Sequence, residues 1–416
     1  MVFLLVIYMW LFVHRPFEVW SVLGSIHIER IYMIFILIFW SVFHRKNFLT
    51  NRSVYALLAL LAAILISEYV NMDPMKFANG EIGKATEDWL KIFLFSLLII
   101  TSIQSEAELK VLLTGFCIIF FIYLAHSLFE YQFRGRHVYR MGTYRMVGID
   151  ESMNDPNSFG ASIVYAIPML IPLWHLQGKT LRHRLIVKTF AVLFFLLALF
   201  CITRTGSRSA FVGAILVLMI LVMISRHRVR WLLTLCIAAP IVWATLGENL
   251  QNRYLTIIDP SRGPKSAQES AEGRVVGIQV GISIWKRFPV FGVGPGNSPK
   301  YNPSKYQLHN FYVQVISELG IIGALAFLIV ISTMIFNVLQ ARKYFYLHRL
   351  LEPPGNVYLF SVSIATTITL FELLLLGTGG HNAYRYNWVW YTAFQGISVM
   401  LLTNQLNDAI IIRSKK

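Results

Sequence analysis

Long apolar runs separated by short polar connections dominate the chain along most of its length. A membrane-spanning helix needs about 20 mostly apolar residues, because the hydrocarbon core of a bilayer is roughly 30 Å thick. Several runs are shorter than this and one is longer, so the pattern predicts about twelve membrane-spanning helices. The predicted spans are 1–13, 29–44, 54–71, 89–103, 109–130, 157–176, 186–203, 209–225, 231–247, 310–340, 357–377 and 387–403.

The composition agrees with a polytopic membrane protein and excludes two other classes. Of the 416 residues, 56% are hydrophobic and 14% are charged, whereas about a quarter of an ordinary soluble domain is charged. A chain this apolar is not intrinsically disordered, because disorder requires low hydrophobicity. Its net charge of +16 also does not indicate a nucleic-acid-binding domain, because such a domain is a soluble fold. We therefore expect an all-α membrane protein, with 1–416 forming a single integral membrane domain. The most polar stretch, 249–309, is predicted to be one long loop containing interfacial helices.

Basic residues in the short connections orient the predicted spans. They cluster in alternate connections, and short loops rich in Lys and Arg face the cytoplasm. Both termini are therefore predicted to be cytoplasmic, and the loops at 72–88, 131–156, 249–309 and 378–386 to face outward, together with the turn at 204–208. The cytoplasmic clusters contain Arg45, Lys46 and Arg52; Lys179, Arg182, Arg184 and Lys188; Arg226, Arg228 and Arg230; Arg342, Lys343 and Arg349; and Arg413, Lys415 and Lys416.

The outward loops are nevertheless rich in arginine. A guanidinium group is a planar fork that matches phosphate oxygens, and ionisable residues at membrane depth are functional by default. The excess favours an anionic ligand delivered from the lipid, such as a lipid diphosphate. Contact with anionic headgroups, or salt bridges to Asp150, Glu151 and Asp155, is the structural alternative. The arginines in short outward segments are Arg134, Arg136, Arg140, Arg145, Arg204 and Arg208, and the long loop adds others, including Arg253 and Arg274.

Two short segments at predicted span ends carry candidate binding residues. Arg204 and Arg208 are four positions apart around Gly206, so they can share one helical face and grip two phosphates, unless they merely snorkel to the interface. In the other segment, Asp155 as N-cap and Pro156 at the first helical position begin a span. The residue that follows them, Asn157, is a candidate hydrogen-bond partner for a substrate. The acidic residues near it are a poor metal site, because arginine is in excess.

The long loop contains a predicted helix and a glycine-rich segment. Ser266 and Glu269 fit a capping box, and 273–288 is a partly apolar helix that we expect to lie in the interface, with Arg274 near its start. The glycines of 289–297 can present backbone N–H groups to an anion, although the segment lacks the Lys-Ser/Thr ending of a P-loop. A tight turn returning the chain to the membrane is the favoured interpretation.

Histidines in two outward segments are candidates for proton transfer. His309 precedes an apolar span and is followed by Asn310. Its imidazole, with a pKa near neutral, is suited to act as a general base at this position. Nearby arginines would lower that pKa and keep the imidazole neutral. The structural alternative is a polar residue at a helix start. A second pair, His381 and Asn382, competes for the same role.

These residues, in this order, resemble the O-antigen ligase and polymerase superfamily of bacterial envelope glycan assembly. The resemblance is strongest over 150–330, and the residues before and after match only as generic spans. The motifs that carry it are Asp155-Pro156-Asn157, Ser207-Arg208, Gly273-Arg274 before Trp285, Pro289 to Asn297, and His309-Asn310 with Glu318 and Gly320.

The resemblance implies an inverting glycosyltransferase of the bacterial inner membrane, with its active site facing the periplasm. It would transfer a glycan from undecaprenyl diphosphate to a hydroxyl of lipid A–core, without a metal or other cofactor, on a fold resembling the GT-C-like lipid-sugar transferases. Arg208 and Arg274 would hold the diphosphate, and His309 would activate the acceptor. The further candidates for substrate binding are Arg204, Arg140, Arg145, Asn157, Asn310 and His381. Membrane lipids are expected partners, and nucleic acid is not.

Three alternatives to an O-antigen ligase remain open. The related polymerase joins repeat units on the lipid carrier, and a protein O-oligosaccharyl ligase transfers the glycan to a protein; both share the donor and the catalytic groups. A lipid or sugar transporter is more distant. Transport predicts ionisable residues at mid-span, whereas the spans contain few beyond Glu68, Glu130 and Glu372.

Overall fold

The computed structural model describes most of the chain. The described residues are 1–43, 51–73, 82–140, 142–176, 180–225, 227–259, 265–351 and 354–414; for Ser21, Arg140 and 265–272 only the backbone is described. Several of the basic residues predicted to be cytoplasmic lie outside the described residues, namely Arg45, Lys46, Lys179, Arg226, Lys415 and Lys416.

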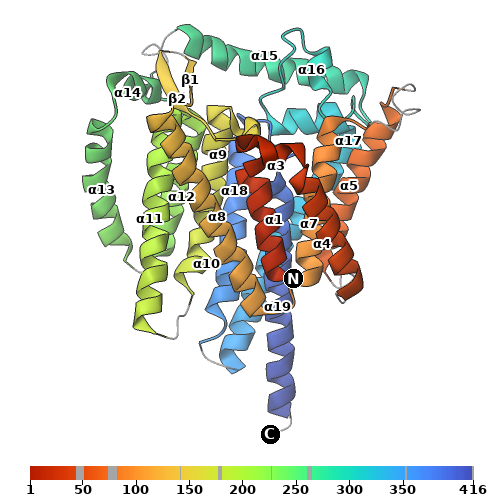
Figure 1. The fold of residues 1–416 in the computed structure, drawn as a ribbon, viewed down its shortest axis with the longest axis vertical. Coiled ribbons are helices and arrows are strands. Elements are labelled where there is room, and N and C mark those ends of the chain that lie inside the picture. The colour runs from red at the N-terminus through yellow and green to blue at the C-terminus, as the bar shows by residue number, and fades with distance from the viewer. Residues whose placement is uncertain are drawn as a thin grey trace.

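Helices form at each of the predicted apolar runs, and they pack as one bundle (Figure 1). By length and composition, the described chain contains six helices able to cross a membrane, and α1 and α12 are shorter apolar helices. The prediction of a polytopic membrane protein is confirmed to that extent. The helices at the runs are α1 (Val2–His14), α4 (Ile28–Phe43), α5 (Arg52–Val70), α7 (Lys84–Ser102), α8 (Glu106–Phe133), α9 (Pro156–Ala166) continued by η2 (Ile167–Met169) and α10 (Leu170–Trp174), α11 (Leu181–Thr205), α12 (Arg208–Ile224), α13 (Arg228–Ala244), α17 (Phe311–Leu351), α18 (Val357–Gly377) and α19 (Tyr386–Ser414).

Short elements gather at the end of the bundle opposite the C-terminus, where α15 crosses the ends of the helices (Figure 1). The helix α15 begins at Lys265, one residue before the predicted capping box, and continues to Arg287. It therefore contains the helix expected at 273–288. The side chains of Ser266 and Glu269 are not described, so the capping box stays a prediction. The other short elements are α2 (Pro16–Val19), α3 (Ser21–Ser25), η1 (Glu151–Met153), α14 (Glu248–Leu255) and α16 (Ser298–Tyr301).

The all-α expectation is confirmed, and a short β-hairpin is the exception to it among the described residues. Strands β1 (His137–Arg140) and β2 (Thr143–Met146) pair antiparallel, with Val138 opposite Arg145. Gly142 has a φ of +75°, which a residue without Cβ adopts readily, and the strands carry the aromatic and β-branched side chains that favour sheets. Strands of four residues are too short to stand out in the pattern of apolar runs.

The core is built around α18 and α19. Almost every residue of α19 from Tyr386 to Leu402 is buried, and the indole rings of Trp388 and Trp390 have no exposed surface. The opposite extreme is α13, in which none of the residues is buried and which stands at the edge of the bundle (Figure 1). Its apolar side chains are therefore available to lipid.

A break at Gly320 divides α17, which the apolar run predicted as continuous. Gly320 has a φ of 66° and a ψ of −161°, and a Cβ there would lie 2.2 Å from the carbonyl oxygen of Val290. The incoming segment bonds to the open backbone: Val293 N donates to Ser317 O at 3.0 Å, and Ile321 N donates to Pro289 O at 2.9 Å. Only glycine permits this approach.

The glycine-rich segment 289–297 returns the chain to the bundle, as predicted, and it donates a hydrogen bond to the side chain of Glu318. Glu318, with no exposed surface, accepts hydrogen bonds from Gly296 N at 3.1 Å and from the hydroxyl of Ser298 at 2.5 Å. A third bond comes from the side-chain amide of Gln314 at 3.3 Å. The carboxylate thereby fixes the segment that leads to His309.

Candidate active site

The three residues predicted to be catalytic approach one another through a short chain of contacts. The guanidinium carbon of Arg274, on α15, lies 3.7 Å from the position that a Cβ of Gly379 would occupy. Gly379 belongs to the connection between α18 and α19, which also carries His381. The Nδ1 atoms of His381 and His309 are 3.4 Å apart, with ring centroids at 5.2 Å. Arg274 also interacts electrostatically with Arg208.

The turn between α11 and α12 sets the position of Arg208. Gly206 caps α11 in the left-handed conformation, with a φ of 56°, and the Ser207 hydroxyl accepts from Ala210 N at 3.4 Å to begin α12. Arg208 is therefore the first residue of an apolar helix, which places its guanidinium group at the end of the bundle.

Two other arginines, both buried, donate hydrogen bonds to backbone carbonyl groups of this turn. Arg145 Nε donates to Thr205 O at 2.7 Å and its Nη2 donates to Asn157 Oδ1 at 2.9 Å; the side chain is 1% exposed. Arg253, 7% exposed, donates from Nε to Gly206 O. Buried polar groups need such partners. Arg145 and Asn157, both predicted to bind substrate, thus contact each other, and Arg145 also contacts the turn.

Arg208 and Arg274 are engaged much less by the protein. Arg208 is half-buried, and its Nη1 donates to the hydroxyl of Thr256 at 3.0 Å. Arg274 is also half-buried and forms no hydrogen bond or ion pair with the described residues. Desolvation by burial and the charge of Arg208 lower the pKa of Arg274, while Asp155 opposes this effect. The charge of Arg208 therefore acts on Arg274, and neither arginine forms an ion pair with the described residues.

The histidine pair combines an exposed ring with a more enclosed one. His309 is exposed and precedes α17, whereas His381 is half-buried. Burial, the charge of Arg385 and His309 together lower the pKa of His381 to about 4, against an opposing effect of Asp155. His381 is therefore neutral at neutral pH, and its Nδ1 can share a hydrogen bond with His309.

Residues 193–328 match the family model described as O-antigen ligase. The matched segment is about a third of the chain and contains Arg208, Arg274 and His309. The predicted resemblance to the O-antigen ligase and polymerase superfamily is confirmed over this segment. His381 and the β-hairpin lie outside it. A search of curated proteins found no match.

The remaining candidates from the sequence have mainly local contacts. The guanidinium of Arg204 lies 5.0 Å from the Phe200 ring, and its Nε is buried with no partner among the described residues. Asn310 begins α17 by accepting from Val313 N at 3.1 Å, and its amide donates to Thr378 O at 3.0 Å. Of Arg140 only the backbone, in β1, is described. Binding of substrate by these residues stays a prediction.

Asp150 and Asp155 have roles that the sequence only partly indicated. Asp155 accepts from Ser158 N at 2.8 Å, which confirms it as the N-cap of α9. Asp150 is 1% exposed and accepts from the hydroxyl of Tyr123 at 2.5 Å. Among the described residues no group of three or more His, Cys, Asp or Glu side chains is arranged to hold a metal ion.

The structure adds Thr256 and Arg385 to the surroundings of the site. Thr256 follows α14 and lies 48 positions after Arg208, its hydrogen-bond partner, so no sequence pattern joins them. Arg385 stands four residues after His381, close enough to influence its pKa. In the sequence, only one feature pointed to Arg385: it lies in the segment 378–386, which was predicted to face outward and which also contains His381.

Proposed function

We propose that this protein is an O-antigen ligase, which transfers a glycan from undecaprenyl diphosphate to a hydroxyl of lipid A–core. The observation that carries the proposal is the juxtaposition of Arg208 and Arg274, both poorly neutralised, with the histidine pair. The family match over 193–328 supports the same class of reaction. The proposal places the protein in the bacterial inner membrane, with about twelve spans, cytoplasmic termini and a periplasmic site.

The arginine pair suits the diphosphate of the donor. Each guanidinium group can bind phosphate oxygens with two parallel N–H groups, and the bonds are stronger because both partners are charged. Arg208 begins an apolar helix, so a phosphate bound there leaves the lipid chain within the bilayer. Positive charge placed in advance on the leaving diphosphate stabilises the transition state, because negative charge grows there as the glycosidic bond breaks.

The histidine pair suits activation of the acceptor. His309 takes the proton of the acceptor hydroxyl, the acceptor oxygen bonds to the anomeric carbon, and the diphosphate leaves with the electron pair of the broken bond. Attack opposite the leaving group inverts the anomeric centre. Neutral His381 can accept a hydrogen bond from His309 Nδ1–H, which leaves Nε2 of His309 as the base. His381 would thus orient His309 and stabilise its charged form. No cofactor takes part in these steps.

Deletion of the gene in its host, followed by electrophoresis of lipopolysaccharide, tests the proposal. Loss of a ligase leaves bare lipid A–core while the long glycan accumulates on undecaprenyl diphosphate. Core carrying a single repeat unit would instead identify a polymerase. Unchanged lipopolysaccharide together with loss of a glycoprotein would identify a protein O-oligosaccharyl ligase. Either of the last two results overturns the assignment to lipid A–core.

A further inference from the structure

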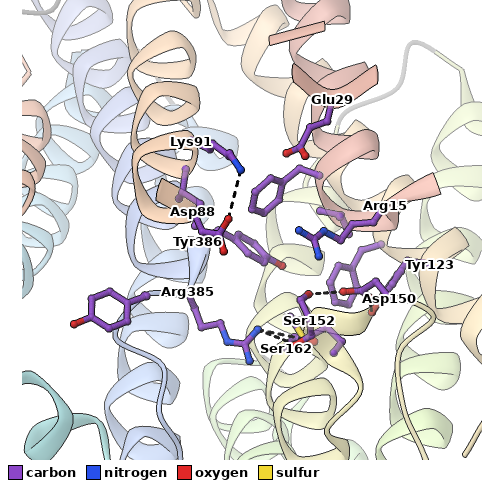
Figure 2. Close-up of a pocket in the computed structure, with 16 residues that line it drawn as sticks. Arg15, Glu29, Asp88, Lys91, Tyr123, Asp150, Ser152, Ser162, Arg385 and Tyr386 are labelled. Atoms are coloured by element: carbon purple, nitrogen blue, oxygen red, sulfur yellow. Dashed lines mark hydrogen bonds and ion pairs between the residues drawn. The ribbon is translucent and has the colours of Figure 1, made fainter. Parts of the chain in front are cut away.

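A second polar region lines a cavity of about 140 Å³ (Figure 2), and Arg385 in its wall interacts electrostatically with His381. Its walls come from the end of α1, the starts of α4 and α7, the middle of α8, the residues around η1 and Ser162 of α9. The connection between α18 and α19 completes the cavity through Tyr384, Arg385 and Tyr386. The charged residues that line it are Arg15, Glu29, Asp88, Lys91, Asp150 and Arg385.

The charge of this cavity differs from that of the arginine pair. Its lining has three basic and three acidic side chains, so a phosphate would meet as many carboxylates as cations. A ligand rich in hydroxyl groups meets no such penalty, because every hydroxyl both donates and accepts hydrogen bonds. The aromatic rings of Tyr123, Tyr384 and Tyr386 add flat apolar surface, as is common in sites for small organic ligands.

Several of the charged groups have spare hydrogen-bonding capacity. Arg385 donates from Nη1 to Ser152 O at 3.3 Å and to Met153 Sδ at 3.7 Å, and its Nε and Nη2 have no hydrogen-bond partner among the described residues. Glu29 accepts one long bond, 3.4 Å, from the hydroxyl of Tyr8. Asp88 lies 3.5 Å from Lys91 Nζ, which is closer to Glu87, at 3.0 Å. Ionisable side chains kept in this state at membrane level indicate a ligand.

The connection 378–385 joins the cavity to the catalytic groups. Near its start, Gly379 packs against Arg274 of the arginine pair. Near its end, Tyr384 and Arg385 line the cavity. His381 lies between these two points in the sequence and contacts His309. A donor diphosphate and a second ligand can therefore be held at the two ends of the segment that carries the histidine.

We infer that the cavity binds a sugar ring of the acceptor, with Arg385 and Asp88 among its hydrogen-bonding groups. The inference rests on the proposed function, since it requires an acceptor that is a carbohydrate. It assigns the two substrates to regions of different charge: the diphosphate to Arg208 and Arg274, and the polyhydroxylated acceptor to the balanced cavity.

Equilibrium binding to the full-length protein in nanodiscs tests this assignment without any need for transfer. The probes are delipidated core oligosaccharide carrying a fluorescent label, and undecaprenyl diphosphate. We expect Arg385→Gln and Asp88→Asn each to weaken oligosaccharide binding by about tenfold and to leave undecaprenyl diphosphate binding unchanged. Arg274→Ala should show the reverse pattern. Arg30→Gln is the matched control, because Arg30 is exposed and does not line the cavity.

Steady-state kinetics on the same variants separate the inference from the proposed function. The cavity variants should raise KM for lipid A–core by about tenfold and change the KM for the donor by less than about twofold. A raised KM for the donor alone would show that the cavity holds the donor glycan and would overturn the inference. So would unchanged oligosaccharide binding in both variants. If the wild-type protein binds the oligosaccharide through the cavity but transfers nothing to lipid A–core, the proposed function fails and the binding site stands.

Discussion

Four arginines near the turn between α11 and α12 form two pairs that differ in what their guanidinium groups contact. Arg145 and Arg253 are buried and donate to carbonyl groups of the turn between α11 and α12. Arg208 and Arg274 are half-buried. Among the described residues, the guanidinium group of Arg208 donates one hydrogen bond, to Thr256, and that of Arg274 donates none. The first pair builds the turn that positions Arg208, and the second pair is left with donors for a ligand. Equal charge and equal location therefore do not mean equal function.

This difference has a physical basis. A buried guanidinium group is costly unless the protein supplies acceptors, and peptide carbonyls at the turn do so for Arg145 and Arg253. Arg208 and Arg274 stay close to each other with little opposing charge, an arrangement that raises the free energy of the empty site. An anion bound between them removes that repulsion, which is the property expected of a diphosphate site.

The largest expected effect is on transfer, when the second pair is removed. Arg208→Ala and Arg274→Ala should each lower kcat/KM by about 10²–10³-fold, because each removes a charged donor from the leaving diphosphate. Thermal unfolding in detergent should remain within about 2–4 °C of the wild type, since neither residue holds the fold. Full activity in both variants would show that the two pairs do not differ as described.

Removal of the proposed base should have an effect of similar or slightly smaller size. His309→Gln is expected to lower kcat by about 10²-fold, the usual contribution of general base catalysis, with little change in donor binding. His381→Gln, which keeps a hydrogen-bonding group beside His309, should retain more activity than His309→Gln. The rates of glycan transfer by the purified variants measure the loss of activity in His309→Gln and in His381→Gln. If His381→Gln is the more damaging change, His381 is the base and the assignment is reversed.

The first pair should act on stability instead. Arg145→Ala is expected to lower the free energy of unfolding by about 2–3 kcal/mol, because Thr205 O and the Asn157 side chain lose their charged donor. Arg145→Lys should recover only part of this free energy of unfolding, since an ammonium group lacks the planar fork of donors that lets arginine bind both acceptors. Arg134→Ala, which removes an exposed ion pair with Glu130, is the control and should change little. Thermal denaturation monitored by fluorescence distinguishes these outcomes.

Near neutral pH the smallest effect is a pH dependence of stability that comes from His381. Its pKa is lowered from 6.5 to about 4 in the folded protein, so the unfolded chain binds more protons between these values. Stability should therefore fall as the pH is lowered from about 6.5 towards 4. His381→Gln should flatten this part of the profile of unfolding temperature against pH. An equally steep profile in the variant would assign the dependence to other groups.

Local chemistry made part of this structure predictable. The apolar runs located the helices, and Asp155 followed by Pro156 identified the start of α9. The histidines and arginines in segments predicted to face outward formed a wider set of candidates, and the resemblance to the O-antigen ligase superfamily selected Arg208, Arg274 and His309 from it. The sequence could also predict that they lie at one end of the bundle, because the positive-inside pattern predicts the same face for all three.

The contacts that divide the arginines could not be predicted. Arg145 reaches a carbonyl 60 residues away, and that pairing depends on how β2 packs against the end of α11. The break at Gly320 likewise depends on backbone bonds from the segment near Pro289. Nor could the sequence show that the glycine amides would bind Glu318. Each of these features is a contact between distant segments, which hydrophobic periodicity does not encode.

Binding of undecaprenyl diphosphate to the purified protein in nanodiscs tests the central claim most directly. The comparison needs the wild type, Arg208→Ala, Arg274→Ala and the control Arg134→Ala, all at the same ionic strength because charge interactions are screened by salt. We predict that the first two variants bind at least about tenfold more weakly and that the control matches the wild type. Equal affinity in all four proteins would contradict a diphosphate site at Arg208 and Arg274.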